Sequence, residues 1–271
     1  MTTPPAVTVV MPVRDPDPAH FRAAVQSVLD QSLSDLELLI VEDVGDRPAA
    51  STVEEFSDPR IRHLANASPG SLGAARNLGL REARADLVAM FDADDVCGAE
   101  RLQKQRERMH HDPELVVLGT QLTIRNDIDN TTGARKYPCT HDEILRTLPV
   151  YNPIAHPSVM LRRQPILDAG GYRDRICEDY DLWSRLAHRQ ARFANLDERL
   201  VTYRIHSGAM KSRALRATIR DTLSVKLEHW RGQLGLRGHS RMLGERLLLL
   251  LPRSMVLTLF DRLYLRDGVR T

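Results

Sequence analysis

The first 95 residues alternate between two kinds of hydrophobic pattern. Continuous apolar runs rich in β-branched residues, such as VTVVMPV, predict strands that are buried on both faces. Stretches in which apolar side chains recur every three or four residues, such as PAHFRAAVQSVLDQS, predict helices. The expected strands are 7–13, 36–43, 61–66 and 86–95, and the expected helices are 18–32 and 68–84. This alternation predicts an α/β fold with a mixed, mostly parallel sheet flanked by helices.

The pattern after residue 97 is less regular. Its periodicity predicts helices at 98–111, 142–149, 164–172 and 178–189, strands at 114–122 and 153–163, and a turn at 126–136. The segment 191–206 is expected to form a hairpin or two edge strands. From residue 213 onward the strand pattern is lost and only helices are expected.

The composition indicates an ordered protein of a reducing compartment. With 271 residues, 42% of them hydrophobic, the chain is long enough to bury a large core. Cys97, Cys139 and Cys177 are scattered and form no CxxC pair, so we expect neither a disulfide framework nor a zinc site. The N-terminal stretch MTTPPAVTVVMPV has no basic residue and is interrupted by proline, which predicts a cytoplasmic protein without a signal peptide or anchor.

The net charge of +2 hides an asymmetry along the chain. Residues 211–271 contain 13 Lys or Arg and 5 Asp or Glu, whereas residues 1–210 contain 25 and 31. We therefore expect an α/β domain at 1–212 and a basic, amphipathic helical region at 213–271.

Three roles remain open for this basic region. It could lie on the anionic inner face of a membrane, form a homo-oligomer contact, or cap the α/β domain. Its run LLLLL is too short to span a bilayer and is followed by Pro252 and Arg253. Nucleic acid is not an expected partner, because aromatic residues are not interleaved with the basic ones.

Acidic residues follow two of the expected strands. Glu42 and Asp43 end LELLIVED, and Asp92, Asp94 and Asp95 follow the apolar run LVAM in FDADDV. The carboxyl ends of parallel strands meet at one edge of a sheet, where ligands of α/β folds bind, so we expect the two clusters to be neighbours. Carboxylates this close repel one another. A cation is therefore implied, either a basic side chain or a metal ion.

The D-x-D pattern has more than one interpretation. Two carboxylates can help to hold a divalent ion that bridges the phosphates of a nucleotide. DADDV also resembles the D-x-D-x-[T/V] nucleophile pattern of haloacid-dehalogenase-like phosphatases. That family carries the pattern on its first strand, however, whereas here three expected strands precede it. A third alternative is a solvated loop or helix cap with no chemistry.

Seven segments in order resemble those of the family 2 glycosyltransferases. They are VTVVMPVRD, VED, GSLGAARNLGL, FDADD, HPSVM, EDYDLW and YRIHSGAM. The resemblance covers about residues 6–212 and implies an inverting, nucleotide-sugar-dependent enzyme with the Rossmann-like GT-A fold. It also implies a nucleotide-binding half at 1–97 and an acceptor-binding half at 98–212.

The resemblance implies a divalent cation, Mn²⁺ or Mg²⁺, at the D-x-D segment. Asp94 and Asp95 are its expected carboxylate ligands, and His206 is expected to reach the metal or the diphosphate from the C-terminal side. The loop residues Ser207 and Gly208 favour this role for His206 over a purely structural one.

The nucleotide is expected to contact residues at the strand ends. They are Pro12, Val13, Arg14, Asp43, Arg76 and Asp92. Many relatives have Tyr or Phe followed by Asn after the first strand; the segment Val13-Arg14-Asp15 departs from that pattern, which puts stacking on the base in doubt. Arg76 could instead form a salt bridge to the acidic strand ends.

The pair Glu178-Asp179 resembles the E-D pair in which a carboxylate serves as general base. We expect Asp179 to be the base, with Glu178 as the alternative. Trp183 is expected to form an acceptor platform, although its helical spacing from Leu182 and Leu186 equally fits a core position. His156 in HPSVM is expected to line the acceptor site or to be structural.

The expected reaction moves a sugar from a nucleotide diphosphate, with UDP as the first choice, to a hydroxyl of a glycan, lipid-linked or polymer acceptor. The remaining alternatives are a phosphatase, a nucleotidyltransferase and a non-catalytic nucleotide-sugar-binding protein. No glycine-rich loop with a basic residue follows the first strand, which disfavours the nucleotidyltransferase.

Overall fold

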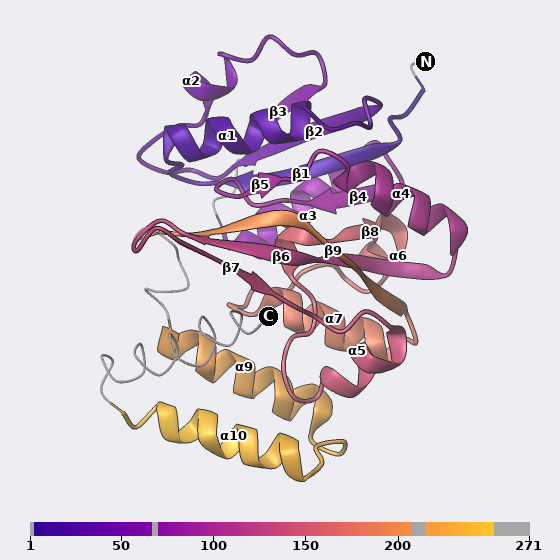
Figure 1. Ribbon diagram of the computed structural model, residues 1–271, viewed down its shortest axis with the longest axis vertical. Helices are drawn as coiled ribbons and strands as arrows, with labels where there is room; N and C mark the ends of the chain where they lie inside the picture. Colours follow the sequence, from indigo (N-terminus) through magenta and orange to yellow (C-terminus); the bar gives the residue numbers. More distant parts are fainter. Residues whose placement is uncertain (1–2, 67–69, 207–214, 252–271) are drawn as a thin grey trace.

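The protein is described by a computed structural model, which defines residues 3–66, 70–206 and 215–251 (Figure 1). One nine-stranded sheet runs through the α/β part of the molecule, with helices on both faces. Its strand order is β3 (Ile61–Ala65), β2 (Leu36–Glu42), β1 (Val7–Val13), β4 (Leu87–Met90), β8 (Met160–Arg162), β6 (Leu115–Asn126), β9 (Arg192–Ile205) and β5 (Val96–Cys97), with β7 (Thr131–Arg135) paired to β6.

Strands β1 to β4 are mutually parallel, and β9 is parallel to β6. The short strands β8 and β5 are antiparallel to their neighbours. Because β8 is antiparallel to both β4 and β6, β6 and β9 run in the same direction as β1 to β4. The carboxyl ends of these six strands therefore lie at one edge of the sheet, which we call the carboxyl edge. This mixed but mostly parallel architecture confirms the predicted fold class.

Three helices of the first half follow the predicted order and cover the sheet, and a four-residue helix between β2 and β3 was not predicted. The four helices are α1 (Pro18–Leu29), α2 (Ala50–Val53), α3 (Leu72–Glu82) and α4 (Arg101–His111). Val9 of β1 packs in the same cluster as Phe21 of α1, and Val10 packs on the other face with Leu80 of α3. A Cβ atom at Gly79 would lie 2.3 Å from Val10, so this glycine lets α3 approach β1 closely.

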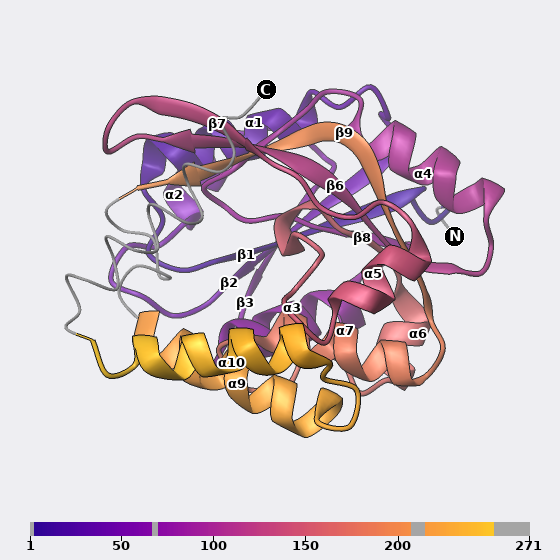
Figure 2. The same ribbon diagram turned by 60° about the horizontal axis from the view of Figure 1, so that its bottom comes forward.

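The second half contains α5 (His141–Thr147), a 3₁₀ turn (His156–Ser158), α6 (Arg163–Asp168) and α7 (Glu178–His188). It is followed by α9 (Leu215–Trp230) and α10 (Leu236–Leu248), which confirm the helices predicted for the C-terminal region within the described residues. Figures 1 and 2 show α9 alongside α7 and α10 alongside α9. The part of the predicted basic region after Leu251 lies outside the described residues, as do Ser207 and Gly208.

Three predictions of local structure are wrong. Segment 191–206 is not a hairpin or a pair of edge strands but the single strand β9, which lies inside the sheet between β6 and β5. Its polar residues Asp197 and Glu198 look like a turn, yet they fall at a register shift where Leu196 pairs with Thr120 and Arg199 with Gln121. A β-bulge thus accommodates them without ending the strand.

The other two corrections concern short segments. The predicted turn at 126–136 contains β7, which pairs with β6 as a hairpin. The predicted strand at 153–163 is mostly irregular: it forms the 3₁₀ turn, which includes Pro157, and only then the three-residue strand β8. Proline has no N–H to donate to a sheet, so the ladder begins after it.

Candidate functional site

The D-x-D segment lies at the carboxyl edge and contacts the end of β9. Nε2 of His206 is 2.9 Å from Oδ2 of Asp94, and Arg204 donates a hydrogen bond from Nε to the backbone oxygen of Asp94 at 3.0 Å. The side chain of Asp94 is 40% exposed. The structure therefore brings together Asp94 and His206, which lie 112 positions apart in the sequence, and leaves the carboxylate accessible.

Asp95 is placed differently from Asp94. Its side chain is completely buried, and its Oδ1 accepts a hydrogen bond of 2.9 Å from the backbone N–H of Arg204. Asp95 thus fastens β9 to the turn after β4. Arg204 also pairs with Asp127 at 2.8 Å, so both ends of this side chain are anchored. Arg204 stands two residues before His206 in YRIH, but no sequence motif marks it as a partner of the D-x-D segment.

Arg76 links the D-x-D segment to α7. The guanidinium lies 3.3 Å from Oδ1 of Asp92 and forms a short ion pair with Glu178. Its side chain is only 3% exposed, and the ring of Tyr172 lies 5.7 Å from it. Burial by itself would lower the pKa of Arg76, but the charges of Glu178 and Asp92 outweigh it, and the pKa is raised. Arg76 is therefore a permanently charged bridge between the two acidic segments.

Asp179 is the more accessible member of the pair at the start of α7. Glu178 is buried against Arg76, whereas Asp179 is half-buried and accepts a hydrogen bond of 2.8 Å from Nδ2 of Asn152. Both lie in the first turn of α7, where the positive end of the helix dipole favours ionised carboxylates. The sequence analysis missed Asn152, because nothing near it in the chain marks it as a partner of α7.

The loops after β1 and β2 form the other side of the carboxyl edge. Arg14 is exposed and its guanidinium is 4.0 Å from Asp43, which is buried and accepts a hydrogen bond from Asn66 at 3.3 Å. The side chains of Pro12 and Val13 are buried, so these two residues can face a ligand only through their backbone.

Asp15 shapes the loop that carries Arg14. It adopts a positive φ of 49° and accepts a hydrogen bond of 2.8 Å from the backbone N–H of Arg47. This contact joins the loop after β1 to the loop after β2. β1 lies between β2 and β4, so Asp43 and Asp92 follow strands two positions apart, about 10 Å at the usual strand spacing. The two acidic clusters are neighbours, as predicted.

The structure places Trp183 and His156 in the interior, which favours the structural alternative over an acceptor-binding role for both. Trp183 is completely buried, so no indole face is left for a sugar ring. Its ring stacks against His156, which is 5% exposed and hydrogen-bonded to the Tyr172 hydroxyl at 2.9 Å. Both side chains belong to the core between α7 and the sheet. The helical spacing of Trp183 with Leu182 and Leu186 therefore indicated the buried face of α7.

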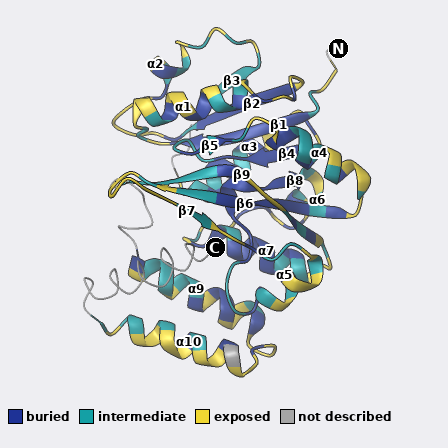
Figure 3. Cartoon of the chain, in the orientation of Figure 1, coloured by how far each residue is buried: buried dark blue, intermediate teal, exposed yellow. Residues whose placement is uncertain are grey.

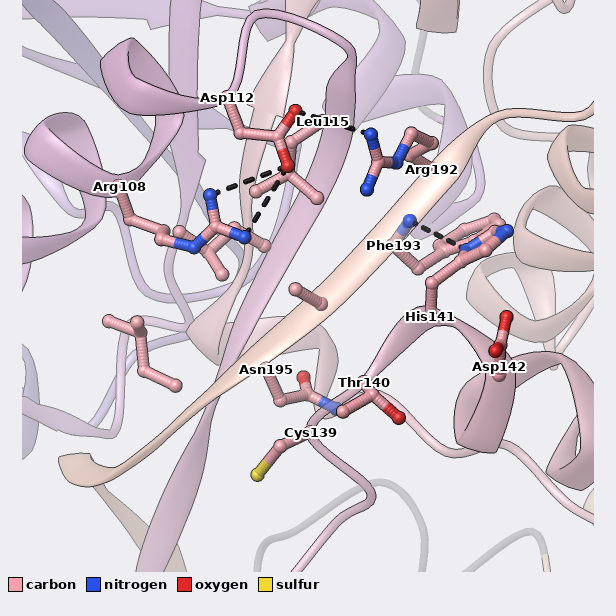
Figure 4. Close-up of a pocket in the computed structure, with 13 residues that line it drawn as sticks. Arg108, Asp112, Leu115, Cys139, Thr140, His141, Asp142, Arg192, Phe193 and Asn195 are labelled. Carbon is pink, nitrogen blue, oxygen red and sulfur yellow. Dashed lines mark hydrogen bonds and ion pairs between the residues drawn. The ribbon is translucent and has the colours of Figure 1, made fainter.

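A pocket of about 390 Å³ lies at the other end of β9 (Figure 4). It is bordered by α4, β6, the start of α5 and the first residues of β9, with Arg108 and Arg192 both facing Asp112 at 3.4 and 3.7 Å. Phe193 lies near the start of β9 and His206 directly follows its end, which places the two about 40 Å apart. The pocket is therefore far from the D-x-D turn. None of the predicted site residues borders this pocket, and its arginines are already paired with Asp112.

One group of potential metal ligands among the described residues has three ligand atoms within 4.8 Å of one another: Asp181, Glu228 and His229. Arg173, Arg175 and Arg185 already pair with the carboxylates of this group. Burial would raise the pKa of Asp181, but hydrogen bonds from His229 and Arg185 outweigh it and lower the pKa. Three guanidinium charges would repel a cation here, so the group fits an ion-pair network rather than a metal site.

Comparisons with known proteins identify the class. The sequence model of "Glycosyl transferase family 2" matches residues 8–171. The O-antigen biosynthesis glycosyltransferase WbnJ of Escherichia coli is 32% identical over 77% of this chain and 83% of its own length. An E. coli UDP-Gal:alpha-D-GlcNAc-diphosphoundecaprenol beta-1,3-galactosyltransferase is 25% identical over 77% of this chain and 78% of its own.

Solved structures agree on the fold. The mannosyltransferase PcManGT from Pyrobaculum calidifontis, in complex with GDP-Man and Mn²⁺, matches with a TM-score of 0.65 at 14% identity, covering 100% of this chain and 77% of that chain. The fold is thus of the GT-A type. The chain belongs to glycosyl transferase family 2. This membership excludes the phosphatase and nucleotidyltransferase alternatives.

Proposed function

We propose that the enzyme transfers a sugar from a nucleotide diphosphate donor to an acceptor hydroxyl with inversion at the anomeric carbon. The observation that carries this proposal is the buried chain of contacts Asp92–Arg76–Glu178. It joins the strand end expected to meet the nucleotide to the helix turn that holds the expected base. Donor and base are thereby kept on one rigid unit, as a direct displacement requires. In this proposal residues 1–97 supply the donor half and residues 98–212 the acceptor half.

Asp179 is the general base in this proposal. It removes the proton of the acceptor hydroxyl as the oxygen attacks the anomeric carbon, and the bond to the diphosphate breaks on the opposite side. Glu178 is less suited to this role because its carboxylate is buried in the pair with Arg76. Arg76 and Arg14 are the cations of this edge that favour a diphosphate nearby.

The residues at the D-x-D turn fit a divalent cation. Asp94 offers an exposed carboxylate, a ligand type that suits Mn²⁺ and Mg²⁺, and His206 places an imidazole nitrogen, a common metal ligand, beside it. A bound cation would stabilise the negative charge that develops on the departing diphosphate. We assign this role to Asp94 and His206, with Asp92 near the ribose or a bound water. The burial of Asp95 under Arg204 favours a structural role for it.

The donor and acceptor classes follow from the relatives. One relative of comparable length is named for a UDP-Gal donor and a lipid diphosphate acceptor, and WbnJ is named for O-antigen biosynthesis. We therefore propose a UDP-sugar as donor and a glycan, lipid-linked or polymer acceptor of a cell-envelope polysaccharide. The structure with GDP-Man shows that the same fold is compatible with another nucleotide. An experimental test must therefore include GDP-sugars as well as UDP-sugars.

Calorimetry with a panel of UDP-, GDP- and TDP-sugars tests the proposed function. With Mn²⁺ present, at least one nucleotide sugar should bind about tenfold more tightly than with EDTA, because the cation offsets the charge of the diphosphate. If no nucleoside diphosphate gains affinity with metal, the metal-assisted donor site is wrong. Donor binding without any sugar transfer to polyprenyl diphosphate or oligosaccharide acceptors would favour the non-catalytic alternative.

Much of the α10 helix is exposed (Figure 3), and several of its exposed residues are leucines that form an apolar stripe. Leu236, Leu243 and Leu247 are 92%, 59% and 53% exposed and recur at helical spacing on one face, and Leu250 beyond the helix is 79% exposed. Exposed Arg246 lies beside this stripe in a region of basic charge. We propose that α10 rests on an anionic lipid surface. Within the described part of the chain, no helix is long and apolar enough to span a bilayer.

The double variant Leu243→Gln, Leu247→Gln should sediment with phosphatidylglycerol vesicles about tenfold less than the wild type, because two apolar contacts with the acyl region are lost. Phosphatidylcholine vesicles and the variant Leu227→Gln, at an exposed position of α9, are the controls. Unchanged sedimentation, together with an altered oligomeric state by light scattering, would instead make the stripe a subunit contact.

A further inference from the structure

The helix that carries the expected base has no N-terminal cap of its own. Cys177 occupies the N-cap position of α7, and its side chain makes no capping hydrogen bond. The backbone N–H of Cys177 is instead donated to Oδ2 of Asp221 at 2.7 Å. Asp221 lies in α9, 44 positions further along the chain. A carboxylate from the C-terminal helical region thus caps the base helix from outside.

The same carboxylate organises the segment that leads into α7. Its other oxygen accepts hydrogen bonds from Nε and Nη2 of Arg175 at 3.2 and 3.1 Å. Arg175 extends from there to Asp181 at 2.8 Å and to Glu228 at 2.9 Å. Asp181 is completely buried. The entry to α7, its first turn and α9 are therefore joined through one guanidinium.

Further contacts continue along α7. His229 lies 3.0 Å from Asp181, and the indole N–H of Trp230 donates to the Ser184 hydroxyl at 2.8 Å. The thiol of Cys177 lies 3.3 Å from the Thr222 hydroxyl. Figure 2 shows α9 lying along α7. These contacts dock the helices; among those of the described residues of α9, the bond from Asp221 is the one that reaches the backbone at the N-cap, directly before the turn that holds Asp179.

The first turn of α7 is held from two sides. On the side of the site, Arg76 pairs with Glu178 and Asn152 donates to Asp179. On the side of α9, Asp221 holds the N–H of Cys177, two residues before Asp179. Helix N-termini fray when their first N–H groups have no partner. Loss of Asp221 would free one end of the turn while leaving the donor-side contacts in place.

We propose that Asp221 is a positioning residue for the general base, which makes α9 part of the catalytic unit. Asp221 does not touch substrate; it acts by fixing the turn that aims the Asp179 carboxylate at the acceptor hydroxyl. This inference rests on the proposed function, because it assumes that Asp179 is the base. It also gives the C-terminal helices a role beyond the membrane contact of α10.

The variant Asp221→Ala tests the inference in the full-length chain. We expect kcat for sugar transfer to fall at least about tenfold, because a small displacement of a reacting group costs rate steeply. The KM for the donor and the calorimetric affinity for UDP with Mn²⁺ should remain those of the wild type. Asp221→Asn keeps an oxygen acceptor for the Cys177 N–H but loses the charge that strengthens this bond, so its kcat should lie between those of Asp221→Ala and the wild type, about threefold below the wild type.

Glu228→Ala is the matched control. It also removes an α9 carboxylate that pairs with Arg175 and Arg173, but it leaves the cap on Cys177 intact. Its kcat should stay within about twofold of the wild type. An equal loss of kcat in Glu228→Ala and Asp221→Ala would show general helix docking and overturn the inference, as would an unchanged kcat in Asp221→Ala.

Two further outcomes are decisive. If Asp221→Ala does not fold, Asp221→Asn is compared with Glu228→Gln: a lower kcat only in Asp221→Asn supports the inference, and equal values overturn it. If the wild type itself binds donor but transfers no sugar to any acceptor, the proposed function has failed rather than the role of Asp221. The wild-type assay therefore separates the two failures.

Discussion

The Asp94→Asn variant is expected to lose metal-dependent binding of the nucleoside diphosphate. Asp94 is the exposed carboxylate of the D-x-D turn and lies beside His206, so the neutral amide removes the anionic ligand of the proposed cation site. The affinity for UDP in Mn²⁺ should fall about tenfold, to the value that the wild type shows in EDTA. Isothermal titration calorimetry of both proteins with UDP, with and without Mn²⁺, measures this directly.

Asp35→Asn is the control for this substitution. Asp35 is exposed and directly precedes β2, so it lies at the opposite edge of the sheet and its loss should leave UDP binding unchanged. The assignment of Asp94 would be wrong if Asp94→Asn kept the gain in affinity with metal. Asp95→Asn should mainly lower the free energy of unfolding, because it weakens the buried bond to Arg204; a folded Asp95→Asn without metal dependence would make Asp95 the ligand.

The Asp179→Asn variant is expected to bind donor and metal as the wild type does but to transfer sugar about 10²- to 10⁴-fold more slowly. The amide cannot accept the hydroxyl proton. Its oxygen can still accept the hydrogen bond from Asn152, so the turn should keep its shape. Single-turnover transfer and calorimetry on the same preparation separate the chemical step from donor binding.

The matched control is Asp142→Asn, the same substitution in the first turn of α5, where the side chain is exposed. It should transfer sugar at the wild-type rate. If Asp179→Asn transferred sugar at the wild-type rate, the general base would be Glu178 or another group. Glu178→Gln would then be the next variant, with a different expected result: loss of the pair with Arg76 should disturb the link to Asp92 as well.

The order of the first strands and helices could be predicted from local pattern alone. Strands β1, β2 and β4 are largely apolar runs, because both their faces are covered, and the helices between the strands show helical spacing. The prediction failed where the signal is not local. β9 contains Asp197 and Glu198 in its middle, and only pairing with β6 across a register shift makes the segment one strand.

The same division applies to the site. The sequence predicted Asp94, His206, Arg76 and the pair Glu178-Asp179 as site residues, and the structure brings these residues to one edge. The sequence could not show that Asp94 is exposed and Asp95 buried, because the two carboxylates are neighbours in one turn and look alike in the local pattern. Nor could it show that Trp183 and His156 are interior, since helical spacing marks a buried face but not what covers it.

By itself, then, the sequence determined the α/β class, the carboxyl edge as the place of the acids and the family to which the chain belongs. These depend on the periodicity of apolar residues and on motifs, both of which are local. Only the tertiary structure decided which acids are free to bind a ligand, that Arg76 joins the two acidic segments, and that Asp221 caps the base helix from α9. Such contacts join residues that are 16 to 102 positions apart, and their distances are set by the packing of helices on the sheet rather than by any neighbouring residue.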